Sequence, residues 1–193
     1  MFGLPHICVD LISGHRFRDS NQVSLPRGSK EAHGNLSRCE YHTSVIGAYF
    51  EDRKDVVSAS QRHWSRLWWD QIRSEYNVVV SEAVVNELAN PNYPYSQDTV
   101  ALVAGIQHIE IISEVHDIVN IYIDRKLMPQ DLLGDALHLA LASYHKCDYL
   151  LTWNCKHLAN PNKFQHIRIV NTVLGLYVPV IITPNQLIGD PND

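Results

Sequence analysis

The chain lacks the signatures of several protein classes. Its 193 residues contain no apolar run near the length of about 20 residues that a membrane-spanning helix needs. Its four cysteines form no CxxC pair, so neither a zinc knuckle nor a disulfide framework is indicated, and buried or unreactive thiols are expected. The first forty residues show no signal-peptide pattern, because Pro5, His6 and Asp10 interrupt the apolar region. We therefore expect a cytoplasmic protein with no membrane partner.

An excess of positive charge is also absent. The formal net charge is −5, which argues against a protein that holds nucleic acid by bulk electrostatics. An acidic site for divalent cations remains open, because bound cations reverse the local sign of the charge. A Gly-rich phosphate loop, an HExxH motif and a Ser–His–Asp signature are all missing. The basic stretch from Arg53 to Arg73 is interpreted as a solvated helix face in preference to a phosphate-contacting face.

Helical and strand patterns alternate from Tyr41 onward. The periodicity predicts strands over 77–80, 108–112, 149–153 and 179–183. It predicts helices over 56–76, 82–89, 97–105, 113–126, 131–146 and 162–174. Ser81 and Ser113 are predicted to cap the second and the fourth of these helices. The strands are rich in β-branched residues and apolar on both faces, which indicates a parallel sheet covered on both sides. The predicted fold class is α/β, a three-layer α/β/α sandwich with a central, mainly parallel sheet.

The segment 1–40 does not share this regularity. It holds Gly, Ser, Pro, Asn and scattered charges without a sustained helix or strand period, so we expect it to be poorly ordered. The residues NLSRCEY directly before His42 would bury polar side chains if they formed a central strand. One hypothesis covers both facts: a shifted reading frame or a misassigned start joins a foreign segment to an intact domain. The domain is predicted over 41–188, with a tail over 189–193.

Three polar residues fall near the carboxyl ends of predicted strands. Glu87 lies in the helix after NVVV, and Asp135 lies near the start of the helix 131–146. Asn154 ends the strand YLLTW. Such ends meet at the sheet edge where α/β folds place their sites, and oxygen ligands from separate elements suit Mg²⁺ or Mn²⁺. Each residue alone has a plain structural explanation, and only their joint placement favours a metal site.

Two further groups are interpreted as packing. His138 lies three residues after Asp135 and could approach the same region, but a satisfied core or boundary histidine is the preferred interpretation. Trp68 and Trp69 are adjacent on a helical pattern, so one of them must face inward.

The combined pattern resembles the PIN-domain proteins, that is, the toxins of VapC type and their relatives. The resemblance covers about 41–188. Besides the WW helix, the blocks that carry it are YHTSVIGAYFED (41–52), VVSEAVVNEL (79–88), DALHLALA (135–142), YLLTWNCKHLAN (149–160) and VIITPNQL (180–187). The last two blocks resemble a subgroup in which TWNxxHxxN replaces the commoner Thr-x-Asp.

The resemblance implies a carboxylate cluster that binds one or two Mg²⁺ or Mn²⁺ ions and cleaves single-stranded RNA or tRNA. Glu87 matches the second acid of the family, Asp135 the third, and Asn154 the fourth position. Thr43 and Ser44 match the polar pair after the first acid, where a hydroxyl supports the metal or its water. A cognate antitoxin and a homodimer are implied as partners by the resemblance alone.

The first position departs from the family pattern. His42 stands where Asp or Glu is expected before Thr-Ser-Val. Imidazole binds Mg²⁺ poorly and tolerates Mn²⁺ better, and the change removes one negative charge. The leading hypothesis is a metal-dependent endoribonuclease of PIN/VapC type, impaired by His42. The alternative is a catalytically inactive PIN fold that binds RNA or a protein partner, and an unrelated α/β binding domain with coincidental acids is disfavoured by the joint motif match.

Overall fold

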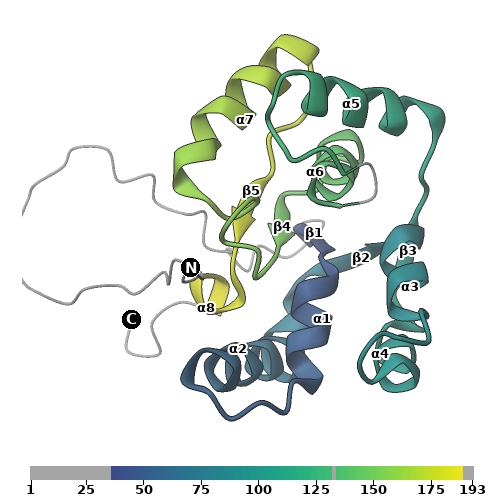
Figure 1. Ribbon diagram of the computed structural model, residues 1–193, viewed down its shortest axis with the longest axis vertical. Coiled ribbons are helices and arrows are strands. Elements are labelled where there is room, and N and C mark those ends of the chain that lie inside the picture. Colours follow the sequence, from purple (N-terminus) through teal and green to yellow (C-terminus); the bar gives the residue numbers. More distant parts are fainter. Residues whose placement is uncertain (1–35, 132–133, 189–193) are drawn as a thin grey trace, which may run out of the picture. The chain divides into compact units, whose positions relative to one another are not determined.

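The described residues form a five-stranded parallel sheet between helices (Figure 1). The computed structural model describes residues 36–131 and 134–188. Its strands are β1 (Arg38–Tyr41), β2 (Asn77–Ser81), β3 (Gln107–Ile109), β4 (Tyr149–Leu151) and β5 (Val180–Ile182). They lie in the order β3-β2-β1-β4-β5, and every neighbouring pair is parallel. The predicted α/β fold with a central parallel sheet is confirmed.

Helices fill the connections between the strands. In the described residues they are α1 (Thr43–Phe50), α2 (Val56–Leu67), α3 (Glu82–Leu88), α4 (Ser96–Val103), α5 (Ser113–Asp124), α6 (Asp135–Tyr144), α7 (Pro161–Leu174) and α8 (Pro184–Ile188). A π-helical segment (Trp68–Ile72) and a 3₁₀ turn (Arg73–Glu75) extend α2. Within the described ranges, none of the helices is long and apolar enough to cross a membrane.

Two hydrophobic cores lie on opposite faces of the sheet. One core joins the sheet to α1, α3 and α4, and the other joins it to α5, α6 and α7. The alternation of side chains along β2 divides it between them, since Val78 and Val80 enter the first core and Val79 enters the second. The strands are therefore buried on both faces, as in other parallel sheets, which explains their continuous apolar sequences.

β1 occupies the middle of the sheet although its sequence is partly polar. Cys39 and Tyr41 are buried in the core on the α1 side, whereas Glu40 is fully buried on the other face. The backbone N–H of Arg38 donates to Oδ2 of Asp148 at 2.7 Å. The strand begins at residue 38, whereas the sequence places the start of the domain at 41. The sequence pattern misses this strand because two polar side chains, Arg38 and Glu40, break the apolar run that marks a buried strand. The expectations for residues 1–35 and for the tail 189–193 lie outside the described residues.

The element types follow the sequence prediction, but several boundaries differ. The hydroxyl of Ser81 caps α3, as predicted. Ser113 was predicted to cap α5 but lies one residue inside the helix, and its hydroxyl donates to the neighbouring Glu114 instead. The helix predicted from residue 131 begins only at Asp135, because Gly134 has a non-helical backbone.

The basic side chains of α2 support the end of α1. Nη1 of Arg62 donates to the carbonyl oxygen of Glu51 at 2.7 Å. Nε of Arg66 donates to the carbonyl oxygen of Tyr49 at 2.9 Å. These carbonyls belong to the last turn of a helix, where they lack partners within the helix itself. Both guanidinium groups thus have a structural role between two helices.

Of the two adjacent tryptophans, Trp68 is buried and Trp69 is half-buried, so one of the pair faces inward as predicted. Trp68 is fully buried and stacks on Tyr41, with ring centroids 5.0 Å apart.

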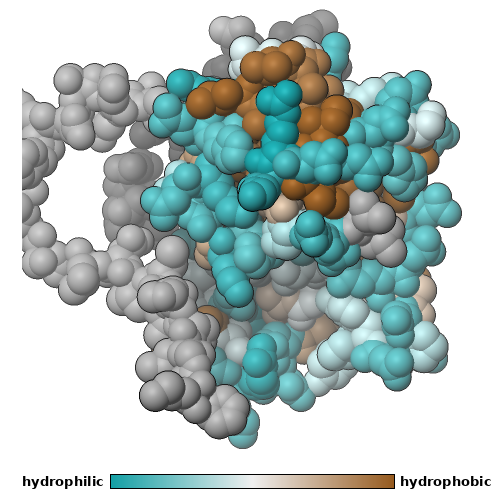
Figure 2. All heavy atoms as spheres, turned by 45° about the horizontal axis from the view of Figure 1, so that its top comes forward, coloured by the Kyte–Doolittle hydropathy of each residue, from teal (hydrophilic) through white to brown (hydrophobic). Residues whose placement is uncertain are grey.

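Exposed apolar side chains gather elsewhere, and Figure 2 shows a hydrophobic area on the face that carries α5 and α7. The large exposed apolar residues of α7 are Phe164, Ile169 and Val173.

Gly175 ends α7 in the left-handed region, with φ 67°. A Cβ at this position would meet no atom within 4 Å, so only backbone strain opposes an alanine. We expect Gly175→Ala to lower the free energy of unfolding by about 1 kcal/mol in urea denaturation. Gly105→Ala is the matched control, because Gly105 also has open space around it and no positive φ. Equal losses of unfolding free energy in the two variants would contradict backbone strain as the reason for glycine at position 175.

Candidate active site at the carboxyl edge of the sheet

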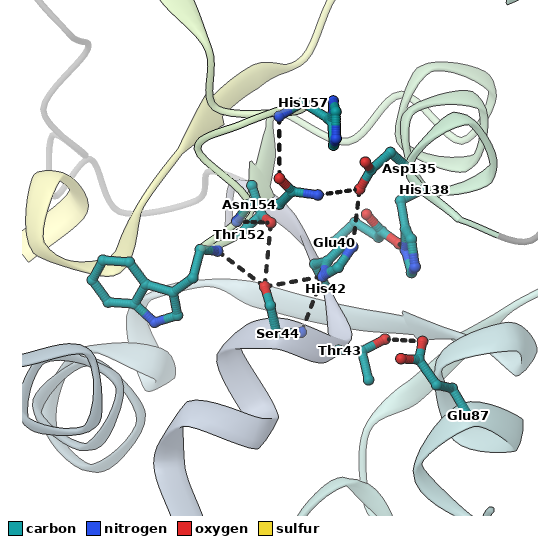
Figure 3. A network of polar contacts seen from close by, with 11 residues as sticks. Glu40, His42, Thr43, Ser44, Glu87, Asp135, His138, Thr152, Asn154 and His157 are labelled. Carbon is teal, nitrogen blue, oxygen red and sulfur yellow. Dashed lines mark hydrogen bonds and ion pairs between the residues drawn. The ribbon is translucent and has the colours of Figure 1, made fainter. Parts of the chain in front are cut away.

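The candidate residues gather where β1, β2 and β4 end (Figure 3). His42 directly follows β1, and Glu87 lies on the helix that follows β2. Asn154 comes shortly after β4, and Asp135 is the first residue of α6. The structure therefore brings the sequence-predicted residues to one edge of the sheet, although they contact each other in two separate sets.

Asp135 is the centre of the first set. Its Oδ1 accepts a hydrogen bond from Nδ2 of Asn154 at 2.7 Å, and Nε2 of His42 lies 3.7 Å from the same oxygen. Burial by itself raises the pKa of Asp135, but the contacts with His42 and Asn154 outweigh burial and hold this pKa below its ordinary value. The carboxylate is therefore charged at neutral pH.

Glu87 belongs to the second set. Its Oε2 accepts a hydrogen bond from Oγ1 of the buried Thr43 at 2.7 Å, while Glu87 itself is exposed. The second oxygens, Oε1 of Glu87 and Oδ2 of Asp135, receive no hydrogen bond from any described residue. Each acid thus keeps one oxygen that is uncommitted among the described residues.

Ser44 and His42 join the end of β1 to the end of β4. The backbone N–H of Ser44 donates to Nδ1 of His42 at 3.0 Å, so the imidazole caps α1. Oγ of Ser44 accepts from the backbone N–H of Trp153 at 3.0 Å and lies 3.3 Å from Oγ1 of Thr152. Thr43 and Ser44 therefore hold Glu87 and the end of β4 in place, and their expected support of a metal or its water stays a prediction.

The block TWNCKHLAN folds into a hydrogen-bonded turn. Oγ1 of Thr152 accepts from the backbone N–H of Asn154 at 3.0 Å, and Oδ1 of Asn154 accepts from the backbone N–H of His157 at 3.1 Å. Three residues later, the side chain of Asn160 caps α7. Asn154, the first Asn of the motif, therefore directs its amide oxygen toward the turn and its amide nitrogen toward Asp135.

The interpretation of His138 as a satisfied core histidine is confirmed, but sequence reasoning missed its partner Glu40 in the buried pair beneath His42. Nδ1 of His138 lies 3.0 Å from Oε1 of Glu40, and both side chains are almost completely buried. Burial raises the pKa of Glu40 to about 8 and lowers the pKa of His138 to about 4. Although the contact has the geometry of an ion pair, burial therefore disfavours the charged form of both groups. The only signal in the sequence was an acid two residues before His42, on the same strand face.

The acids suit a cation site with few protein ligands. No group of three or more His, Cys, Asp and Glu side chains within the described ranges has the geometry to hold a metal ion. Mg²⁺, however, is usually held through one or two carboxylates, with waters and substrate phosphates completing its shell. The charges of Glu87 and Asp135 both act on the pKa of His138, so both carboxylates lie within electrostatic reach of one side chain. Two carboxylates with one uncommitted oxygen each fit this chemistry.

Glu40→Gln tests the buried carboxyl group. A pKa raised in the folded state stabilises that state fully below the ordinary pKa, and the contribution is lost as the pH rises through the folded-state value of about 8. We expect the free energy of unfolding of the natural chain to fall more steeply than that of Glu40→Gln between about pH 5 and pH 9. Urea denaturation across this range measures it, with exposed Glu82→Gln as the control. Parallel pH profiles would refute the raised pKa.

Neither a family model nor a curated protein sequence matches the chain. Among solved structures, the sarcin–ricin loop cleaving toxin VapC20 of Mycobacterium tuberculosis is 16% identical, with a TM-score of 0.46 over 64% of this chain and 95% of its own. VapBC2 of Rickettsia felis, bound to a DNA fragment from its promoter, is 13% identical, with a TM-score of 0.41 over 76% and 98%. Likeness at this level carries no functional argument, and the TWNxxHxxN subgroup stays a prediction.

Proposed function

We propose that the chain is a Mg²⁺- or Mn²⁺-dependent endoribonuclease of PIN/VapC type with weakened activity. The observation that carries this proposal is the position of Asp135 and Glu87 at the carboxyl edge of a parallel sheet, each with one oxygen that receives no hydrogen bond from the part of the chain that the structure describes. A divalent cation bound there supplies Lewis-acid activation of water and stabilises charge on a phosphodiester. The motif resemblance points to single-stranded RNA or tRNA as the substrate.

The tasks of the chain's own residues follow from their contacts. Asp135 and Glu87 would hold the cation, and the hydroxyl of Thr43 orients Glu87. Ser44 keeps the ends of β1 and β4 together through its hydroxyl and so fixes the distance between α1 and the turn that carries Asn154. RNA approaches at the exposed side of Glu87. The two carboxylates present negative charge to the RNA backbone, which a bound cation would offset.

The weakened activity follows from the charge of the site. His42 and Asn154 occupy two of the four positions where the PIN pattern places acids. A site with fewer carboxylates binds divalent cations more weakly, because ligand charge tunes the affinity. An imidazole at the edge also favours Mn²⁺ over Mg²⁺. The same two residues favour the second candidate, a catalytically inactive PIN fold that binds RNA or a protein partner.

The partners in this proposal come from the resemblance. A cognate antitoxin would cover the edge that holds Asp135 and Glu87, and its binding would block RNA. Homodimerisation is proposed on the same basis.

RNA cleavage by the purified chain tests the function. We expect Mn²⁺-dependent cleavage of a mixed single-stranded RNA pool, suppressed by EDTA and reduced at least about 100-fold in Asp135→Ala and in Glu87→Ala. Glu82→Ala, an exposed acid on the same helix as Glu87, is the matched control and should cleave normally. His42→Asp should increase the rate if the missing acid limits activity. RNA binding without cleavage in every variant would favour the inactive fold.

Thermal unfolding tests the cation site separately. A ligand that binds only the folded state stabilises it by RT ln(1 + [L]/Kd), which is about 1.4 kcal/mol at ten times Kd. We expect millimolar Mn²⁺ to raise the melting temperature of the natural chain by a few degrees and to leave that of Asp135→Ala unchanged. An equal shift in both proteins would place the ion elsewhere.

A further inference from the structure

The orientation of the Asn154 amide is set by the turn that follows β4. The backbone N–H of His157 donates to Oδ1 of Asn154 at 3.1 Å, so this oxygen is already occupied by a donor. An amide that accepts through its oxygen on one side presents its NH₂ group on the other. That group faces Asp135 and donates to Oδ1 at 2.7 Å. Asn154 therefore offers Asp135 a hydrogen-bond donor.

The orientation of the His42 ring is set in the same way by α1. Because the backbone N–H of Ser44 donates to Nδ1 of His42 at 3.0 Å, the neutral imidazole carries its hydrogen on Nε2. Nε2 lies 3.7 Å from Oδ1 of Asp135. This distance exceeds that of a hydrogen bond, but the N–H dipole still points its positive end at the carboxylate. His42 thus presents a donor, like Asn154.

Both donors converge on the same oxygen. Oδ1 of Asp135 meets Nδ2 of Asn154 and Nε2 of His42, whereas Oδ2 receives no hydrogen bond from the residues that the structure describes. We propose that His42 and Asn154 are positioning residues that hold Oδ1 of Asp135 and leave Oδ2 as the oxygen that binds a divalent cation. The inference deepens the proposed function, since it uses the same cation site.

Two neutral donors beside Asp135 avoid the charge repulsion that clustered acids create. Adjacent carboxylates repel each other until a cation binds between them, whereas an amide or an imidazole attracts a carboxylate without any ion. Asp135 is therefore oriented before the cation arrives. The arrangement also predicts that Asn154→Asp destabilises the chain without a cation and stabilises it with one. The substitution puts a second carboxylate oxygen where Nδ2 now lies, 2.7 Å from Oδ1 of Asp135.

Mn²⁺ binding by the full chain, followed by water-proton relaxation, and melting temperatures with and without Mn²⁺ test the inference. Asn154→Ser removes the donor without adding charge and should weaken Mn²⁺ binding about tenfold. His42→Asn keeps a good helix cap but shortens the side chain, so it should weaken Mn²⁺ binding severalfold with little change in melting temperature. These two variants separate positioning of Asp135 from support of the fold.

Asn154→Asp should lower the melting temperature without metal, raise it above that of the natural chain at saturating Mn²⁺, and tighten Mn²⁺ binding at least about tenfold. Asn162→Asp is the matched control. It adds the same charge at an exposed position in the first turn of α7, and it should leave the Mn²⁺ affinity unchanged and the melting temperature nearly so.

The results discriminate between the inference and the proposed function. Mn²⁺ affinities of Asn154→Ser and His42→Asn equal to that of the natural chain would overturn the inference, even if the chain cleaves RNA. A natural chain that binds no Mn²⁺ would overturn it as well. The expected changes in Mn²⁺ affinity without any RNA cleavage would support the inference and refute the nuclease.

Discussion

The burial of β1 between two parallel neighbours is the constraint on which the site depends. Its register with β2 and β4 sets how far each strand reaches toward the carboxyl edge. The hydroxyl of Ser44, just past β1, then accepts the backbone N–H of Trp153, just past β4. Because these two strand ends are tied together, the residues that follow them stay within reach of α6. A looser central strand would separate Asp135 from both of its donors.

Charge at this edge is arranged in two layers. Below, Glu40 and His138 are buried, and burial shifts the pKa of each toward its neutral form. Above, the carboxylate of Asp135 is kept charged by contacts with His42 and Asn154. The ring of His42 lies between the layers, 4.1 Å from the ring of His138. The carboxylate of Asp135 therefore lies above a buried pair whose charged forms are disfavoured, which limits repulsion in the absence of a cation.

The sequence predicted most of the fold because the strands β2 to β5 are short apolar runs between helical periods. It failed at β1, since Arg38 and Glu40 look like surface residues until their partners are known. Glu40 is paired with His138, which is 98 positions away in the sequence, and no local pattern encodes such a contact. The misplaced cap of α5 has a smaller cause: several polar residues near a helix start can serve, and backbone geometry chooses among them.

Residue types and spacing alone determined the fold class, the edge of the sheet where polar residues meet, and the acids Glu87 and Asp135 as candidates. These follow from periodicity and from the rule that parallel strands end at one edge. Only the tertiary structure decided which atoms face each other. The amide of Asn154 turns its nitrogen toward Asp135 because the backbone N–H of His157 occupies its oxygen. A side-chain orientation of this kind depends on contacts made after folding, which a sequence pattern does not contain.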